Sequence, residues 1–150
     1  MSARLEIHDG TANNTLTFDM KDVLRVLPAW ARNLDWYVLD LEATGEPRSG
    51  EESVMALEHK MRSSKHGLKL TWGKLQEVAD RLTQTINAVI VGLSPGQPAP
   101  SLPPQSEYRG RFIVIEAIDS SLWAVTSNDA SVIDRLRQHF RDTKLVPGAA

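Results

Sequence analysis

Cysteine is absent from this chain of 150 residues, and its absence narrows the possible chemistry. Without cysteine there is no disulfide and no thiolate metal site, and the composition is compatible with a reducing cytoplasm. No apolar run approaches the ~20 residues that a membrane-spanning helix needs. The first ten residues also lack the basic and then apolar order of a signal peptide. We therefore expect a cytoplasmic protein that has no membrane partner.

Net charge is also scarce, because 17 basic residues nearly balance 19 acidic ones and leave a net charge of -2. The global basic field of a nucleic-acid-binding protein is missing, so we expect no nucleic-acid partner. The sequence has no glycine-rich phosphate loop, and its four histidines are spread over separate expected elements. We therefore predict no cofactor and no metal site.

Hydrophobic periodicity predicts a single α+β domain over residues 1–150, with a largely antiparallel sheet of five to six strands covered by about four helices. Strands are expected at 4–7, 15–18, 35–43, 88–93, 111–119 and 122–126, and helices at 20–27, 49–64, 72–86 and 129–140. The clearest helical pattern is the recurrence of Trp72, Leu75, Ala79, Leu82 and Ile86 at intervals of three and four residues. We expect these five side chains to form one buried helix face.

Proline is concentrated in residues 94–110, which contain five of the eight prolines of the chain. Such a segment cannot join a helix or a central strand. It is predicted to be a mobile, solvent-exposed loop that a protease cuts first near Tyr108 or Arg109. The forty residues beyond it are too few to bury a core alone, so we place no domain boundary there. A flexible tail is expected at 145–150.

The stretch Val38 to Gly45 reads VLDLEATG and belongs to a run rich in aromatic and branched residues, which we interpret as a β-strand. Side chains alternate between the two faces of a strand. Strict alternation places Trp36, Val38, Asp40 and Glu42 on one face, and Tyr37, Leu39, Leu41 and Ala43 on an apolar face that we expect to be the core face. Asp40 and Glu42 would then stand roughly 7 Å apart on the solvent side.

This stretch resembles the first motif of the DEDD-type proofreading exonucleases, in which an Asp-x-Glu pair followed by Thr-Gly holds catalytic magnesium ions. The resemblance covers residues 38–45 only, and it implies that Asp40 and Glu42 would bind metal with further carboxylates, for which Glu116 is a candidate. A two-metal site requires the later motifs of that family, and these do not occur here. The simpler interpretation is a half-buried strand whose solvent face carries two acids.

Acidic residues are concentrated between Asp35 and Glu58, where seven acids accompany a single base, Arg48. An acidic strip on a nearly neutral protein can steer a basic partner, although it can equally be a solvated surface. Aromatic side chains commonly anchor protein interfaces. We predict a partner-binding surface that consists of Trp36, Asp40, Glu42, Glu46, Glu51, Glu52 and Tyr108.

From Leu34 to Lys144 the layout of the chain resembles that of the immunity proteins of bacterial polymorphic and contact-dependent toxin systems. The similarity rests on GLKLTWGKLQEVADRLTQTINAVIVG (residues 67–92) and on an Asp-Ser-Ser-x-Trp turn before the final helix. These proteins act by binding, so the resemblance implies that the partner is a cognate toxin domain, often a basic nuclease, and that there are no catalytic residues. We predict that the protein is not an enzyme and that it occludes the active site of the toxin. The alternative hypothesis is a metal-dependent nuclease that uses Asp40 and Glu42.

Overall fold

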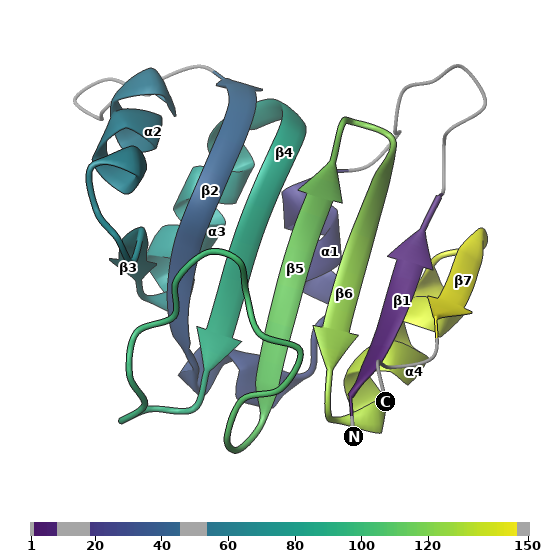
Figure 1. The fold of residues 1–150 in the computed structure, drawn as a ribbon. Helices are drawn as coiled ribbons and strands as arrows, with labels where there is room; N and C mark the ends of the chain where they lie inside the picture. Colours follow the sequence, from purple (N-terminus) through teal and green to yellow (C-terminus); the bar gives the residue numbers. More distant parts are fainter. Residues whose placement is uncertain (1, 9–18, 46–53, 147–150) are drawn as a thin grey trace.

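Within the described residues the fold is a seven-stranded antiparallel sheet with most of its helices on one face, as a computed structural model shows (Figure 1). The structure describes residues 2–8, 19–45 and 54–146. The strands follow the order β3-β2-β4-β5-β6-β1-β7 across the sheet. This arrangement confirms the predicted α+β class and the single domain, with slightly more strands than the five to six expected.

Two sets of elements make up the described chain. The strands are β1 (Ala3–Ile7), β2 (Asp35–Gly45), β3 (Leu68–Leu70), β4 (Leu82–Leu93), β5 (Phe112–Ile118), β6 (Leu122–Ser127) and β7 (Thr143–Val146). The helices are α1 (Met20–Val26), α2 (Val54–Arg62), α3 (Trp72–Arg81) and α4 (Ala130–His139), with a short 3-10 helix, η2 (Ala29–Asn33). The strand predicted at 15–18 lies outside the described residues.

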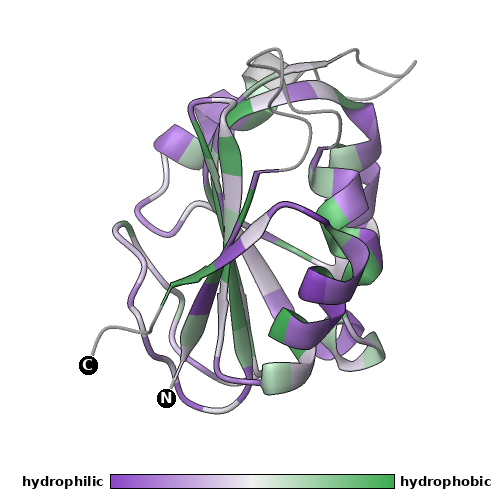
Figure 2. Ribbon diagram, turned by 90° about the vertical axis from the view of Figure 1, so that its right-hand side faces the viewer, coloured by the Kyte–Doolittle hydropathy of each residue, from purple (hydrophilic) through white to green (hydrophobic). Residues whose placement is uncertain are grey.

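The main hydrophobic core lies between the sheet and the helices α1, α3 and α4, which occupy one side of the sheet in Figure 2. Its largest fully buried side chains include Trp36, Trp123, Leu24 and Leu75. Helix α2 lies along the outer edge of β2, where the Glu58 Oε1 atom accepts a 3.0 Å hydrogen bond from the Ala43 backbone N–H. This bond occupies a backbone donor that an edge strand otherwise leaves unpaired.

A second apolar cluster lies on the opposite face of the sheet, below the loop that joins β4 to β5. It consists of Tyr37, Leu39, Val91, Leu93, Phe112 and Val114, against which Ala99 and Tyr108 of the loop pack. In Figure 1 this loop crosses in front of β2, β4 and β5. The loop therefore covers the part of this face that the second apolar cluster occupies.

The predicted solvent exposure of the proline loop holds for most of its residues, but Pro100 is buried and Tyr108 is half-buried. Hydrogen bonds tie the loop down, one of 3.0 Å between His66 Nδ1 and the Pro100 carbonyl oxygen and another of 2.9 Å from Ser2 Oγ to the Ser106 carbonyl oxygen. Proline also loses less conformational entropy than other residues when a segment is ordered. A proline-rich loop can thus cover an apolar surface at a lower entropic cost. Its mobility stays a prediction.

Tyr108 provides a test of how firmly the loop is held. Its ring packs edge-on against Phe112 with centroids 5.5 Å apart, and its hydroxyl oxygen accepts a 2.8 Å hydrogen bond from the Gln105 backbone N–H. We expect Tyr108→Ala to accelerate tryptic cleavage after Arg109 several-fold, because the loop then opens more often. Mass spectrometry of timed digests measures this rate. Leu102→Ala is the control, since Leu102 is 51% exposed and should leave the rate unchanged; equal rates for all three proteins would contradict the prediction.

The predicted alternation of β2 is wrong because the strand contains a β-bulge. Its register against β4 shifts between Val38 and Asp40, so that Leu39 is an extra residue. Trp36 and Val38 therefore lie in the main core together with Leu41. The bulge moves the phase of the strand by one residue, and this places the first half of the predicted solvent face inside the protein.

The predicted third helix is also too long, because α3 ends at Arg81 and β4 begins at the next residue. The first half of β4 pairs with the end of β2, with Ala43 opposite Thr85 and Gly45 opposite Leu82. The branched residues of this segment favour a strand, and pairing with β2 decides the conformation. Leu82 remains buried, whereas Ile86 is only partly buried and does not belong to a helix face.

Two short edge strands, β3 and β7, were not predicted from the sequence. Strands of three and four residues are too short to show a periodic pattern. Strand β7 also corrects the predicted flexible tail at 145–150, because Leu145 pairs with Leu5 and Val146 with Arg4. The remaining residues of the predicted tail lie outside the described chain.

The strands predicted at 111–119 and 122–126 and the last predicted helix are confirmed. β5 and β6 pair with Ile118 opposite Leu122, and Asp119 and Ser120 in the connecting turn have positive φ angles of 48° and 58°. Helix α4 is capped by Asp129, whose Oδ1 atom accepts hydrogen bonds of 2.9 Å from the Ser131 backbone N–H and 2.7 Å from the Ser131 hydroxyl. These bonds, the hydroxyl bond above all, lower the pKa of Asp129.

Asp129→Ala should lower the free energy of unfolding by about 1 kcal/mol at pH 7, as loss of a helix cap usually does. Because the pKa of Asp129 is lower in the folded protein, its contribution is full above the unfolded value of 3.8 and is lost as the pH falls through the folded value. The difference between variant and parent should therefore shrink in acid. Urea unfolding at several pH values measures it. Asp134→Ala, at an exposed position of α4, is the control, and a pH-independent difference would contradict the assigned cause.

Candidate binding surface on the open face of the sheet

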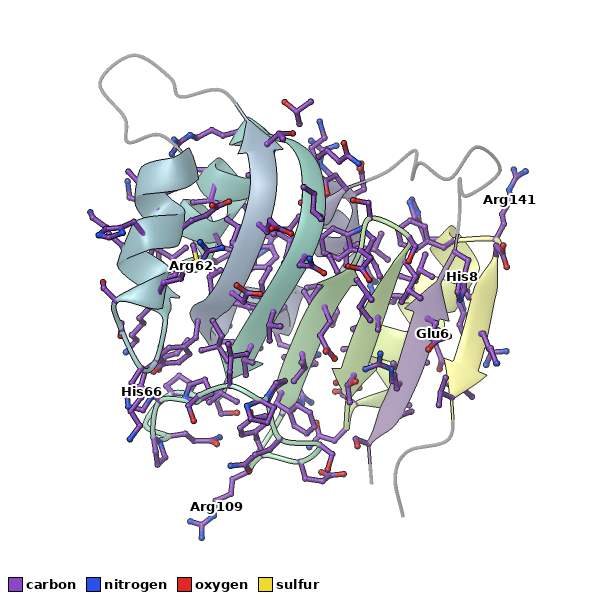
Figure 3. All side chains as sticks on the ribbon, turned by 45° about the horizontal axis from the view of Figure 1, so that its top comes forward. Glu6, His8, Arg62, His66, Arg109 and Arg141 are labelled. Carbon is purple, nitrogen blue, oxygen red and sulfur yellow. The ribbon has the colours of Figure 1, made fainter. Side chains whose placement is uncertain are left out.

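On the sheet face that carries the second apolar cluster, the part that the proline loop leaves uncovered carries polar side chains. Among the described residues no helix or loop lies across this part. We call this part the open face. It comprises β6, β1 and β7, together with the segments of β2, β4 and β5 that extend beyond the proline loop. Figure 3 shows Glu6 and His8 on β1 at this face, while Arg109 projects away from the loop. Leu5 and Ile7 of β1 are buried in the main core, on the other side of the sheet. The alternation of β1 thereby directs Arg4, Glu6 and His8 to the open face.

Backbone pairing places one row of side chains straight across the open face. The row reads Asp40, Val89, Glu116, Ala124, Glu6 and Lys144, from β2 to β7. Directly paired residues point to the same face of a sheet. The three carboxylates therefore occupy every second strand, with Cα atoms roughly 10 Å apart given the ~4.8 Å spacing of strands.

Arg4 joins two of these carboxylates. Its Nη1 atom lies 2.9 Å from Glu116 Oε1, and its Nε atom lies 4.0 Å from Glu6 Oε2. The other oxygen of Glu6 lies 3.4 Å from His8 Nε2. The side chains of Arg4, Glu6 and Glu116 are 30%, 23% and 23% exposed, so the cluster is partly shielded from water. A single guanidinium group thus forms ion pairs with two carboxylates.

Glu42 continues the acidic surface toward the end of β2. Its Oε1 atom accepts a 2.9 Å hydrogen bond from Asn87 Nδ2, and Asn87 Oδ1 in turn accepts a 3.0 Å bond from the Asp119 backbone N–H. Glu42 is exposed, and Asp40 is half-buried. The chain of bonds fixes the Glu42 side chain on the strand while it remains accessible to solvent.

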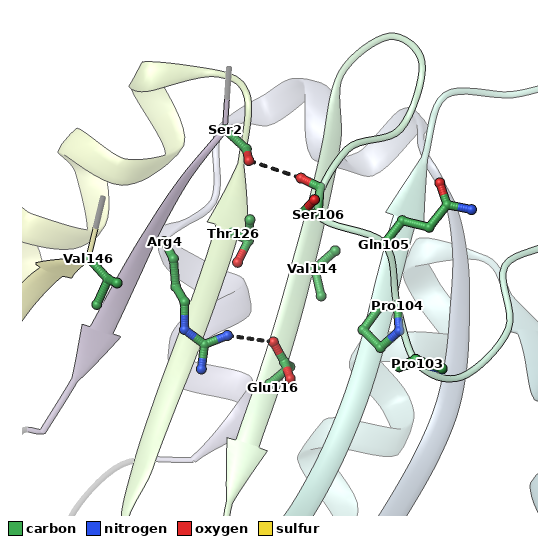
Figure 4. Close-up of a pocket in the computed structure, with 10 residues that line it drawn as sticks. All are labelled: Ser2, Arg4, Pro103, Pro104, Gln105, Ser106, Val114, Glu116, Thr126 and Val146. Carbon is green, nitrogen blue, oxygen red and sulfur yellow. Dashed lines mark hydrogen bonds and ion pairs between the residues drawn. The ribbon is translucent and has the colours of Figure 1, made fainter. Parts of the chain in front are cut away.

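A groove of about 440 Å³ runs between the proline loop and β1 on this face (Figure 4). Glu116, Val114 and Thr126 line it from β5 and β6, Pro103 and Pro104 from the loop, and Arg4 and Val146 from β1 and β7. In Figure 4 the Arg4 side chain extends across β6 to Glu116. The groove therefore combines apolar side chains with one ion pair.

The residues predicted to bind a partner lie in different environments in the structure. Asp40 and Glu42 lie on the open face, as a partner-binding role requires. Trp36 is fully buried and donates a 2.9 Å hydrogen bond from Nε1 to the Ala31 carbonyl oxygen, so its prediction as a surface anchor is wrong. Tyr108 is half-buried in the second apolar cluster. The predicted residues Glu46, Glu51 and Glu52 lie outside the described residues.

Sequence reasoning missed Arg4 and Glu6 as members of this surface. The available signal was the alternation of Arg4, Glu6 and His8 with Leu5 and Ile7 in the first strand. That pattern identifies an exposed strand face but not the distant strands that share it. The sequence suggested Glu116 only as a further carboxylate beside Asp40 and Glu42. In the structure Glu116 instead pairs with Arg4, over a sequence separation of 112 residues.

Asp40, Glu42 and Glu116 share the open face but do not converge on one point, because β4 lies between β2 and β5. Across residues 2–8, 19–45 and 54–146, no group of three or more His, Asp or Glu side chains has a geometry that could hold a metal ion. Asp40, Glu42 and Glu116 are thus spread over the face and do not form a coordination site by themselves.

Comparison with protein-family models, with curated proteins and with solved structures finds no match for this chain. In the described part of the chain, no helix has the length and apolar character needed to cross a membrane.

Proposed function

We propose that this protein is an immunity-type inhibitor that binds a cognate toxin domain through the open face of its sheet and covers the toxin's active site. The observation that carries the proposal is the row of carboxylates on the open face, Asp40, Glu116 and Glu6, next to a groove with apolar walls. The layout-level resemblance to toxin immunity proteins supports the same function.

The physical argument begins with rigidity. Paired strands hold the backbone of each carboxylate, so little conformational entropy is lost when a partner binds. Negative charges at fixed spacing attract a basic surface, such as the active-site cleft of a nuclease, and speed its association. The apolar walls of the groove can accept the few side chains that usually supply most of the binding energy of an interface.

The metal-dependent nuclease remains the alternative hypothesis, and no observation on the described residues favours it over binding. The two hypotheses differ in what Asp40→Asn should do. If the protein is an inhibitor, neither magnesium nor manganese should produce nucleic-acid cleavage in the parent, and the variant should behave identically. Metal-dependent cleavage of nucleic acid by the parent protein that Asp40→Asn abolishes would contradict the inhibitor hypothesis.

Co-expression with a candidate toxin domain from a neighbouring gene tests the proposed function. We expect the parent protein to restore growth and to inhibit the toxin in a purified assay. The double charge reversal Asp40→Lys with Glu42→Lys should reduce this inhibition at least tenfold, because it replaces attraction by repulsion on the open face. Inhibition titrations with purified components measure the change, and a steeper salt dependence in the parent is the accompanying sign of steering.

The control is the double variant Glu77→Lys with Asp80→Lys, which makes the same charge change at exposed positions of α3. It should inhibit the toxin as well as the parent does. The exposed residues Glu42, Glu77 and Asp80 contribute little to stability, and circular dichroism checks that the variant at the half-buried Asp40 is folded. Equal effects of both double variants would remove the open face as the contact surface, and a lack of protection by the parent would contradict the immunity function.

A further inference from the structure

We propose that the groove on the open face receives a basic side chain, arginine or lysine, of the partner protein. The inference rests on the proposed function, because it specifies the chemistry of one contact that the open face makes. Three features of the groove support it: its charge, the remaining hydrogen-bonding capacity of its carboxylate, and its apolar walls.

The charged side chains that line the groove, Arg4 and Glu116, balance each other, and the row of the sheet beside the groove has a small excess of negative charge. Arg4 lies 2.9 Å from Glu116 and 4.0 Å from Glu6, so one positive group is shared by two negative ones. His8, 3.4 Å from Glu6, adds a positive charge only when it is protonated. Asp40 adds a further carboxylate in the same row of the sheet, and Lys144, opposite Glu6 on β7, adds a positive charge. Together with Arg4 beside it, the row therefore carries three carboxylates against the two cations Arg4 and Lys144. The excess negative charge would repel an anionic side chain, whereas a cationic side chain would neutralise it.

Glu116 has hydrogen-bonding capacity left for an incoming donor. An ionised carboxylate offers about four acceptor positions, and the bond from Arg4 Nη1 to Glu116 Oε1 uses one of them. The side chain of Glu116 is 23% exposed, so it is accessible but already partly removed from water. Partial removal from water strengthens the attraction of a second cation and lowers the remaining cost of desolvation.

The walls of the groove suit the hydrocarbon part of such a side chain. Val114, Pro103, Pro104 and Val146 present apolar groups beside the carboxylate. Arginine and lysine pack their methylene stems along apolar surfaces while the charged end reaches a polar group. A groove of about 440 Å³ falls within the usual ~300–1,000 Å³ range of ligand sites, which is ample for one long side chain.

Short capped tripeptides test the inference without the partner. We would titrate the isotopically labelled full chain with acetylated, amidated Gly-Arg-Gly and follow the amide resonances of Val114, Glu116 and Thr126 by NMR. Norleucine and glutamate peptides of the same form are the control ligands. The arginine peptide should shift these resonances, the norleucine peptide should bind at least tenfold more weakly, and the glutamate peptide should not bind.

Two variants should change the affinity for the arginine peptide in opposite directions. Glu116→Gln should weaken binding about tenfold or more, as loss of a hydrogen bond to a charged group does. Arg4→Gln should strengthen binding several-fold, because it removes the cation that competes for Glu116. Glu77→Gln, the same change on α3, is the matched control and should leave the affinity unchanged. Circular dichroism confirms that each variant is folded.

The inference is overturned if no arginine peptide binds the parent protein, if the norleucine peptide binds equally well, or if Arg4→Gln weakens binding as Glu116→Gln does. The last result would mean that the ion pair only maintains the shape of the groove. These outcomes are separate from the proposed function, which fails if the charge reversal at Asp40 and Glu42 leaves toxin inhibition intact. Toxin inhibition that depends on the open face, together with a groove that binds no arginine, would leave the proposed function standing alone.

Discussion

Trp36→Ala should lower the free energy of unfolding by about 3 to 5 kcal/mol, a large share of the ~5–15 kcal/mol that stabilises a typical domain. Trp36 is fully buried, its indole N–H donates a 2.9 Å bond to Ala31, and its ring lies 5.7 Å from the ring of Trp72. A Cβ atom at Gly92 would come within 2.8 Å of this ring, which shows how closely β4 approaches it. Urea unfolding followed by circular dichroism measures the loss.

Trp36→Phe is the matched comparison, because it keeps an aromatic ring in the core and should cost less than Trp36→Ala. The experiment also distinguishes the buried role of Trp36 from the surface role that the sequence suggested. A surface anchor would give a variant of nearly normal stability and weak partner binding. Stability within 0.5 kcal/mol of the parent, well below the ~3–5 kcal/mol cost of emptying a core site, would therefore contradict the burial of Trp36.

Leu82→Ala should lower the free energy of unfolding by about 2 to 5 kcal/mol, as truncation of a buried leucine does. Leu82 is 5% exposed and belongs to the main core, although it begins β4 and does not extend α3. Ile86→Ala should cost less, about 1 kcal/mol, because Ile86 is only partly buried and a fully buried side chain contributes about 1.5–3 kcal/mol.

The comparison of Leu82 with Ile86 tests where α3 ends. If the helix continued to Ile86, both residues would lie on one buried face, and the two substitutions would cost similar amounts. Denaturant unfolding of the two variants side by side measures the difference. Equal losses would contradict the transition from helix to strand at Leu82.

The candidate surface was predictable only in part. Asp40 and Glu42 were identified from local sequence, because an acidic pair in an apolar strand points to a solvent face. Their partners in the row come from elsewhere, with Glu116 on β5 and Glu6 on β1. Pairing between strands so far apart in sequence leaves no pattern in a single segment. The misplaced Trp36 has a different cause, since a bulge at Leu39 changes the phase of the strand without a local signal such as glycine.

Local sequence was sufficient to predict the α+β class, the positions of α1 and α4, and the strands β5 and β6, since periodicity is a local property of the chain. Local sequence did not predict the end of α3 at Arg81, the phase of β2, or the covering role of the proline loop. Each of these depends on contacts between distant segments, whose free energy outweighs the small intrinsic preferences of single residues. The open face has the same origin, because the antiparallel order of seven strands brings its carboxylates into one row.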